Sequence, residues 1–264
     1  MSQEILFTLF KQSIESYSLP DKFTYPFEYE PHPLCLLAVE ELQKHIRTQK
    51  DWVHNFGLED GKKGKIVGKM FGVLLVQNND GKIGYLAAFS GSLAGKNQQP
   101  HFVPSLHDIM DKDGFVTEGM LRITDYCNKV NELALHKADN HQEIIALKKE
   151  RKAFSEALSL KIYHQFKFLN YKGEQKSLYA IFEPTKHKNP PGGAGECAAP
   201  KLLQYAYLND LKPLALAEFW WGQSPKTEHW KHKHFYPVCL HKCQPILTHM
   251  LEGLDVEEKP VFRI

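Results

Sequence analysis

The sequence predicts a mixed α/β fold: a central sheet, flanking helices and one inserted helical hairpin. Two apolar runs in 70–90 flank an Asp-Gly turn, which is typical of a β-hairpin. Apolar residues recur at helical spacing in 34–48 and again in 198–208. A highly charged stretch, 117–170, carries a single apolar seam with helical periodicity. The hairpin should therefore nucleate the sheet, with the first two helical segments packed against it.

Composition narrows the class of protein. The chain has 264 residues, 42% of them apolar and 24% charged, which is ordinary for a globular protein with a sizeable core. The net charge of +2 argues against a uniformly basic, nucleic-acid-coated surface but leaves room for a local basic patch. No apolar run approaches the roughly 18 residues of a membrane span, and the N-terminus lacks a signal-peptide pattern. Five cysteines, an odd number, fit a reducing compartment, so we expect a cytoplasmic location.

The first part of the core is expected within residues 1–116. Residues 5–17 form an amphipathic pattern that predicts a first helix. A proline-rich aromatic segment then predicts an extended arm, and 34–48 predicts a second helix. The hairpin strands, 70–77 and 83–90, are apolar nearly throughout, so both faces of the sheet should be covered.

The remaining elements divide into an insert and a second half of the same core. Residues 117–170 should form two antiparallel helical arms with a break near 138–140. The C-terminal half, 171–264, should return to the sheet and carry a cluster of cysteines. Its expected elements are a short strand at 177–183, a helix at 198–208, a strand at 214–221 and a helix at 239–251.

Three cysteines in this half are candidate metal ligands. Cys197 falls at the start of one predicted helix, and Cys239 and Cys243 lie four residues apart on one face of the next. Thiolates are good zinc ligands, so the sequence predicts a zinc site with three sulfurs. The fourth position would be taken by water or by a histidine, the candidates being His234, His241 and His249. Two alternatives stay open: reactive thiols of low pKa at helix N-termini, or buried cysteines acting as small apolar residues.

Two basic runs are candidate RNA contacts, since each lysine can neutralise a backbone phosphate. The residues are Lys226, Lys231 and Lys233 in a histidine-rich loop, and Lys148, Lys149, Arg151 and Lys152 in the helical insert. The alternative for both runs is a solvated surface. Phe219, Trp220 and Trp221 could stack on bases, although core packing is favoured because neighbouring residues of a strand face opposite ways. Glu218 is the carboxylate most suited to burial, as a structural group or an acid of shifted pKa.

Several segments resemble the N-terminal extension of a long bacterial variant of the RluA-type pseudouridine synthases. They are FTYPFEYEPHPLCLLAVEELQ, FGVLLVQNNDGKIGYLAAFSGSLAG, FLNYKGEQKSL, PPGGAGECAAPKLLQYAY, PLALAEFWWGQSPK and FYPVCLHKCQPILTHMLEGLDV. The resemblance implies an accessory domain that assists binding or positioning of rRNA or tRNA. It also implies a pseudouridine synthase domain downstream in the gene product or in a separate chain. The His-Arg-Leu-Asp-type motif of that isomerase domain is absent here, so no pseudouridine-forming residue is expected in this chain.

The order of elements also resembles the zinc-dependent deaminase fold, which places ligands at the starts of two helices around a strand. That resemblance implies a deaminase-like enzyme, or a degenerate relative, with Glu196 as the catalytic acid. Two departures are visible: Glu196 precedes Cys197 instead of following the first ligand by two residues, and the second cysteine pair is one residue wider. A third possibility is a structural module that assembles through its helical hairpin.

Overall fold

The computed structural model describes residues 6–111, 113–135, 140–226 and 229–260. The chain divides into two units. Unit 1 comprises Met1–Ser105, Phe168–Lys176 and Gly193–Ile264, and unit 2 comprises Leu106–Lys167 and Ser177–Gly192. No helix in the described ranges is long and apolar enough to cross a membrane.

The predicted hairpin forms the centre of unit 1. Strands β2 (Lys69–Gln77) and β3 (Ile83–Phe89) pair antiparallel from Phe71↔Phe89 to Gln77↔Ile83. Asn78 closes the turn, because its side-chain oxygen accepts the backbone N–H groups of Asp80 and Lys82. Both strands are buried along most of their length, which confirms the expectation that both faces are covered.

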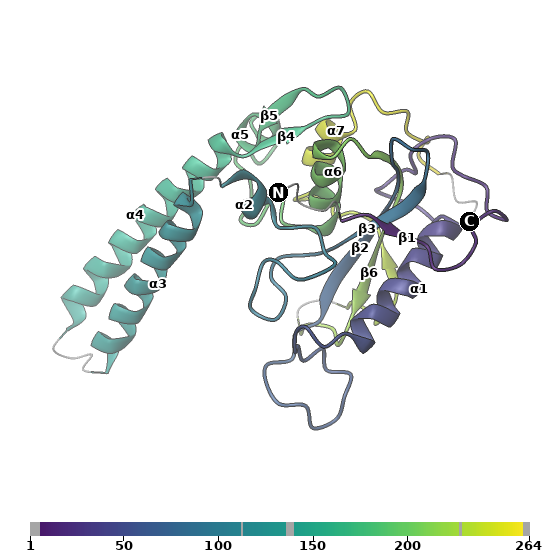
Figure 1. Cartoon of the computed structure of the whole chain (residues 1–264). Coiled ribbons are helices and arrows are strands. Elements are labelled where there is room, and N and C mark those ends of the chain that lie inside the picture. The colour runs from purple at the N-terminus through teal and green to yellow at the C-terminus, as the bar shows by residue number, and fades with distance from the viewer. Residues whose placement is uncertain (1–5, 112, 136–139, 227–228, 261–264) are drawn as a thin grey trace. The chain divides into compact units, whose positions relative to one another are not determined.

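Three further strands complete a five-stranded sheet of order β1-β3-β2-β6-β7. Figure 1 labels β1, β2, β3 and β6 of this sheet. β6 (Lys212–Trp221) confirms the predicted strand and runs antiparallel to β2, and β7 (Phe235–Tyr236) pairs with it. β1 (Thr8–Leu9) lies along the other edge, against β3. The predicted helix over 5–17 is therefore wrong across its described part: pairing with an open sheet edge prevails over a weak amphipathic pattern.

Two helices cover opposite faces of the sheet. α1 (Pro33–Thr48) packs on the face that carries Phe71, Val73 and Leu75, and together they form the main apolar core. α6 (Ala198–Leu208) packs on the other face, where Gly72 contacts Ala198 and Leu202. Figure 1 shows the sheet between these two helices. Because successive strand residues face opposite ways, β2 serves both layers.

The last helix of unit 1 begins later than expected. α7 (Gln244–Met250) packs against α6, and Cys243 is its N-cap. Residues 239–243 form a turn, so the prediction of a helix over 239–251 is wrong at its start. Pro245 explains the boundary, since proline is accommodated in the first turn of a helix and not in its interior.

Unit 2 contains the predicted helical arms. α3 (Phe115–Ala134) and α4 (His141–Gln165) are antiparallel: Gly119 near the start of α3 lies against Leu158 near the end of α4. Arg122 stacks on the Phe154 ring at 4.4 Å. Most of the predicted break at 138–140 lies outside the described residues. A short helix, α2 (Leu106–Met110), precedes the arms.

The segment 177–183 is a helix and not the predicted strand. α5 (Leu178–Phe182) is capped by Ser177, whose hydroxyl accepts the N–H of Ala180. An apolar run of five residues cannot distinguish a strand from a buried helical turn, and the serine cap decides the outcome here. β4 (Lys167–Leu169) and β5 (Gln175–Ser177) pair in a separate two-stranded sheet. β5 directly precedes α5 in the sequence.

Candidate metal centre

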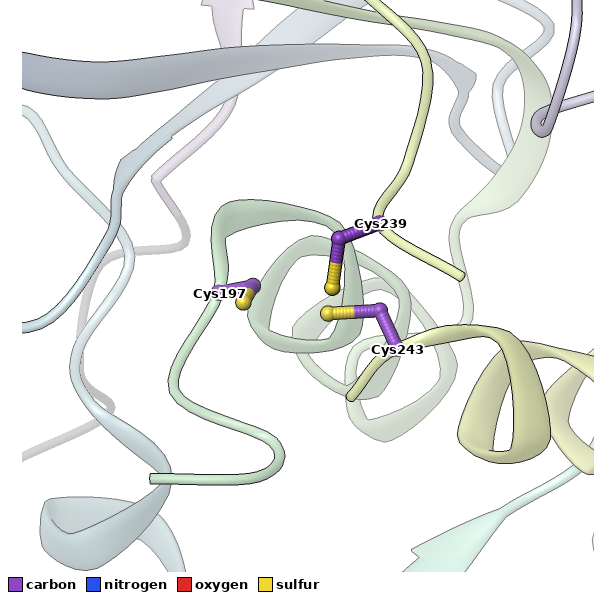
Figure 2. A group of neighbouring side chains, drawn as sticks. All are labelled: Cys197, Cys239 and Cys243. Carbon is purple, nitrogen blue, oxygen red and sulfur yellow. The ribbon is translucent and has the colours of Figure 1, made fainter. Parts of the chain in front are cut away.

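Three cysteines from two distant parts of unit 1 meet at the starts of α6 and α7. Cys197 is the N-cap of α6, Cys243 is the N-cap of α7, and Cys239 lies in the turn before α7. Their three Sγ atoms lie within 4.8 Å of one another. Figure 2 shows the sulfurs converging from the two sides of this junction. All five cysteines of the chain are free thiols, so these three could together hold a metal ion.

Backbone hydrogen bonds hold the turn that presents two of the sulfurs. The carbonyl of Cys239 accepts the N–H groups of Cys243, at 3.3 Å, and of Gln244, at 3.1 Å. These bonds place Cys239 beside Cys243, although only Cys243 is part of the N-terminus of α7. Val238 is buried and donates its N–H to the Pro26 carbonyl at 3.0 Å, which anchors the turn to the proline-rich arm.

The third sulfur is positioned by the contact of α6 with the sheet. The N–H of Ala199, in the first turn of α6, donates to Oε1 of Glu218 at 3.1 Å. A Cβ at position 72 would lie 2.9 Å from the Cβ of Ala198, so glycine is required for this close approach. The sheet therefore holds the start of α6, and with it Cys197, against β2 and β6.

The three thiols do not share one protonation state. The pKa of Cys239 is strongly lowered, chiefly because the thiols of Cys197 and Cys243 donate hydrogen bonds to its thiolate. Backbone N–H groups of Lys242 and Cys243 add to this effect. The hydrogen bond with Cys239 raises the pKa of Cys197, and hydrogen bonds with Cys197 and then with Cys239 raise the pKa of Cys243. The cluster thus favours the thiolate at Cys239 and the neutral thiol at Cys197 and Cys243, and a set of reactive thiols stays a prediction.

None of the three candidate histidines belongs to the ligand group within the described residues. His249 is buried, with Nε2 bonded to the Phe168 carbonyl at 3.0 Å and Nδ1 3.5 Å from Glu252. His234 and His241 are exposed and contribute no ring nitrogen to the group. The three sulfurs could supply three ligands to a metal ion, and Cys239 is exposed, so solvent reaches the cluster on its side.

Glu196, the carboxylate expected beside the cysteines, has another partner. Its Oε2 lies 3.2 Å from Nζ of Lys201, which is only 1% exposed. The same ammonium donates to the carbonyls of Phe89 and Gly91, at 3.1 and 3.3 Å. This network ties the chain before α6 to the end of β3, and it explains why a lysine can be buried on α6.

Glu218 is the carboxylate that the structure places beside the cysteines. It is 4% exposed in the middle of β6, which confirms its predicted burial. Its pKa is raised to about 8, chiefly by burial; the hydrogen bond from Ala199 acts against this rise, and the charge of Cys239 adds to it. The carboxyl lies outside the group of ligand atoms but senses the thiolate electrostatically. The position of Glu218 within an apolar strand was the sequence signal for its burial. In the structure Glu218 pairs with Gly72 and faces α6.

The predicted RNA contacts fall in both units. Lys226, Lys231 and Lys233 are exposed in unit 1. Lys148, Lys149, Arg151 and Lys152 lie on α4 in unit 2; Arg151 donates to the Cys127 sulfur, and Lys152 lies 3.8 Å from Glu156. Phe219, Trp220 and Trp221 are buried, as the packing interpretation predicts, and Trp230 stacks on Trp220 at 5.6 Å.

Comparisons of the chain with family models, with curated proteins and with solved structures find no match.

Proposed function

We propose that this chain is a zinc-binding accessory domain of an RluA-type RNA pseudouridine synthase. The observation that carries the metal part is the convergence of the Cys197, Cys239 and Cys243 sulfurs within 4.8 Å. The synthase part rests on the resemblance of six sequence segments. The proposal makes the chain a cytoplasmic partner of rRNA or tRNA, joined to or associated with a separate catalytic domain.

Zinc is the ion that this donor set suits best. Three thiolates with one open position favour zinc over calcium or magnesium, which prefer oxygen ligands. A zinc–sulfur bond of about 2.3 Å implies sulfurs about 3.8 Å apart in a tetrahedral site. The sulfurs lie within 4.8 Å of one another, so each sulfur–sulfur distance would have to shorten by at most about 1 Å. The exposed Cys239 lies in a turn that can supply this adjustment.

A bound ion would join elements that are far apart in the sequence. Cys197 belongs to the start of α6, and the other two ligands belong to the turn before α7. Binding also stabilises the folded chain by mass action, because the three sulfurs converge only after folding.

Metal titration of the reduced, chelator-treated protein tests the zinc part. We expect one equivalent of zinc to bind and one equivalent of cobalt(II) to give a thiolate-to-metal charge-transfer band. Replacing Cys197, Cys239 or Cys243 by Ser should weaken that band and the zinc affinity at least about tenfold. Cys127→Ser is the matched control, because Cys127 lies on α3 outside the cluster, and it should bind like the wild type. A band of equal strength in all four variants would overturn the assignment.

RNA retention on filters tests the accessory part. The basic residues of both units should give an affinity that falls steeply from low to moderate salt, because binding rests on counterion release. Retention that is absent at low salt would exclude this role and leave the metal site unaffected.

A second candidate, a deaminase-like hydrolase, is favoured by one observation: Glu218 is buried beside the cysteines with a pKa of about 8. A zinc ion with one open position supplies an activated water. A carboxyl group with this pKa could accept and return a proton near neutral pH, the role that Glu196, paired with Lys201, does not fill. Ammonia release from cytidine or adenosine by the zinc-loaded protein, abolished in Glu218→Gln, is the expected result. No release from the zinc-loaded wild type would exclude this candidate.

A further inference from the structure

A second site lies in unit 1 among residues that take no part in the metal centre. A cavity of about 690 Å³ opens between the C-terminal end of α1, the loop over 49–62 and the end of β6. His232 and Lys233, from the histidine-rich loop, also line it. This volume lies within the range of cavities that bind small molecules.

The wall of this cavity is strongly cationic. Arg47, Lys50, Lys62 and Lys233 line it, whereas the one lining carboxylate is Glu59. Glu59 is already paired with Lys62 at 3.1 Å. Arg47, Lys50 and Lys233 have no carboxylate within 4.0 Å in the described part of the chain. All three are exposed, and cations that line one cavity create a positive potential there that attracts an anionic ligand.

His232 offers a hydrogen-bond donor at the same place. Its Nδ1 accepts the N–H of Gly222 at 3.1 Å, so the proton of the neutral ring resides on Nε2. Nε2 has no hydrogen-bond partner among the described residues. The pKa of His232 is lowered by burial and then by the charges of Lys233 and Arg47, which places both cations close to the ring.

The floor of the cavity is aromatic. Trp221 is 2% exposed, its ring lies 4.4 Å from the ring of His232, and the Arg47 guanidinium lies 6.0 Å from its centre. Trp52 and Phe56 meet edge to face beside it, at 6.1 Å. The three rings are nearly buried and offer edges and not open faces, so the floor can contact a base or ribose while arginine binds phosphate.

Hydrogen bonds within the chain fix the wall of the cavity. The side-chain amide of Gln49 exchanges two hydrogen bonds with the backbone of Trp52, and Gln223 donates its N–H to the Phe56 carbonyl at 2.7 Å. His54 uses both ring nitrogens, on the Val67 carbonyl and the Ala94 N–H. A preformed site loses less conformational entropy on binding.

We propose that this cavity binds a nucleoside phosphate. Arg47, Lys233 and His232 would hold the phosphate, and the aromatic floor would contact the base or ribose. A free mononucleotide and one nucleotide of an RNA strand present the same chemical groups to the cavity. Binding of an RNA strand would rest on the proposed RNA-binding function, whereas binding of a free mononucleotide would not.

Binding measured on the full chain tests the proposal with uridine 5′-monophosphate, uridine, inorganic phosphate and a short single-stranded oligouridylate as probes. We expect the monophosphate or the oligonucleotide to bind more tightly than uridine and phosphate. The double substitution Arg47→Ala with Lys233→Ala should weaken that binding at least about tenfold. The matched control, Lys82→Ala with Lys129→Ala, removes two charges from exposed sites outside the cavity and should bind within about twofold of the wild type.

The two nucleotide probes distinguish the sources. Binding of the monophosphate that depends on Arg47 and Lys233 identifies a mononucleotide site, and dependence seen only with the oligonucleotide identifies a strand site. Thermal unfolding of both double variants checks that they are folded. Equal affinity of the two double variants for every probe would overturn the proposal, as would a wild type that prefers inorganic phosphate. Neither result would affect the proposed metal site. RNA retention through the lysines of α4 would also remain possible, so failure of this proposal is distinguishable from failure of the proposed function.

Discussion

Replacing Glu218 by glutamine should change how the stability of the metal-free protein depends on pH. Glutamine keeps the oxygen that accepts the Ala199 N–H but cannot ionise. In the wild type, burial raises the pKa of Glu218 from 4.5 to about 8. The folded state therefore binds this proton between those pH values while the unfolded state has released it. Stability due to Glu218 is fully present below pH 4.5 and is lost as pH rises to about 8.

The size of the effect follows from the same two values. A shift of one pH unit corresponds to about 1.4 kcal/mol, so the free energy of unfolding falls by at most about 5 kcal/mol across the whole interval. The stability of Glu218→Gln should not fall in this way, because glutamine does not ionise. The variant should differ little from the wild type at pH 5 and become more stable than it by several kcal/mol at pH 8.5.

Urea unfolding under chelator and reductant, followed by the fluorescence of the buried tryptophans, measures the difference. Glu40→Gln is the control, because Glu40 is exposed on α1, and its curve should run parallel to that of the wild type. If the stability of Glu218→Gln falls with pH as steeply as that of the wild type, Glu218 is not protonated in the folded protein and the reasoning fails.

Three further substitutions test how the starts of the helices are held, each by urea unfolding. Gly72→Ala should lower stability by about 1–3 kcal/mol, because the new methyl group would overlap Ala198; an unchanged midpoint would contradict this. Lys201→Met should lower the free energy of unfolding by about 3–5 kcal/mol, because Glu196 and two backbone carbonyls lose the ammonium group. The control is Lys82→Met at an exposed site. A loss of stability smaller than that of the control would be inconsistent with the network. Tyr29→Phe should cost about 1–3 kcal/mol, because its hydroxyl accepts the Glu218 N–H and donates to the Tyr236 carbonyl, and a neutral effect would show that water replaces it.

Local patterns were sufficient for the most regular elements. The hairpin of β2 and β3, the helix α1 and the helix α6 were predictable because each has a period, a cap or a turn encoded in a few adjacent residues. The two arms α3 and α4 follow from their periodicity in the same way. Elements that depend on a distant partner were not predictable: β1 exists because it pairs with β3, and Ser177 caps α5 where only a short apolar run was visible.

The candidate site divides along the same line. The sequence by itself determined that Cys197, Cys239 and Cys243 stand near helix starts, because proline, glycine and apolar spacing mark those boundaries locally. Only the tertiary structure decided which carboxylate accompanies them, and it paired Glu196 with Lys201 and set Glu218 beside Cys239. The cationic cavity likewise unites Arg47 of α1 with Lys233, far along the chain. The physical reason is that side-chain neighbours across a sheet are chosen by strand register and packing, which bring together residues that no local pattern connects.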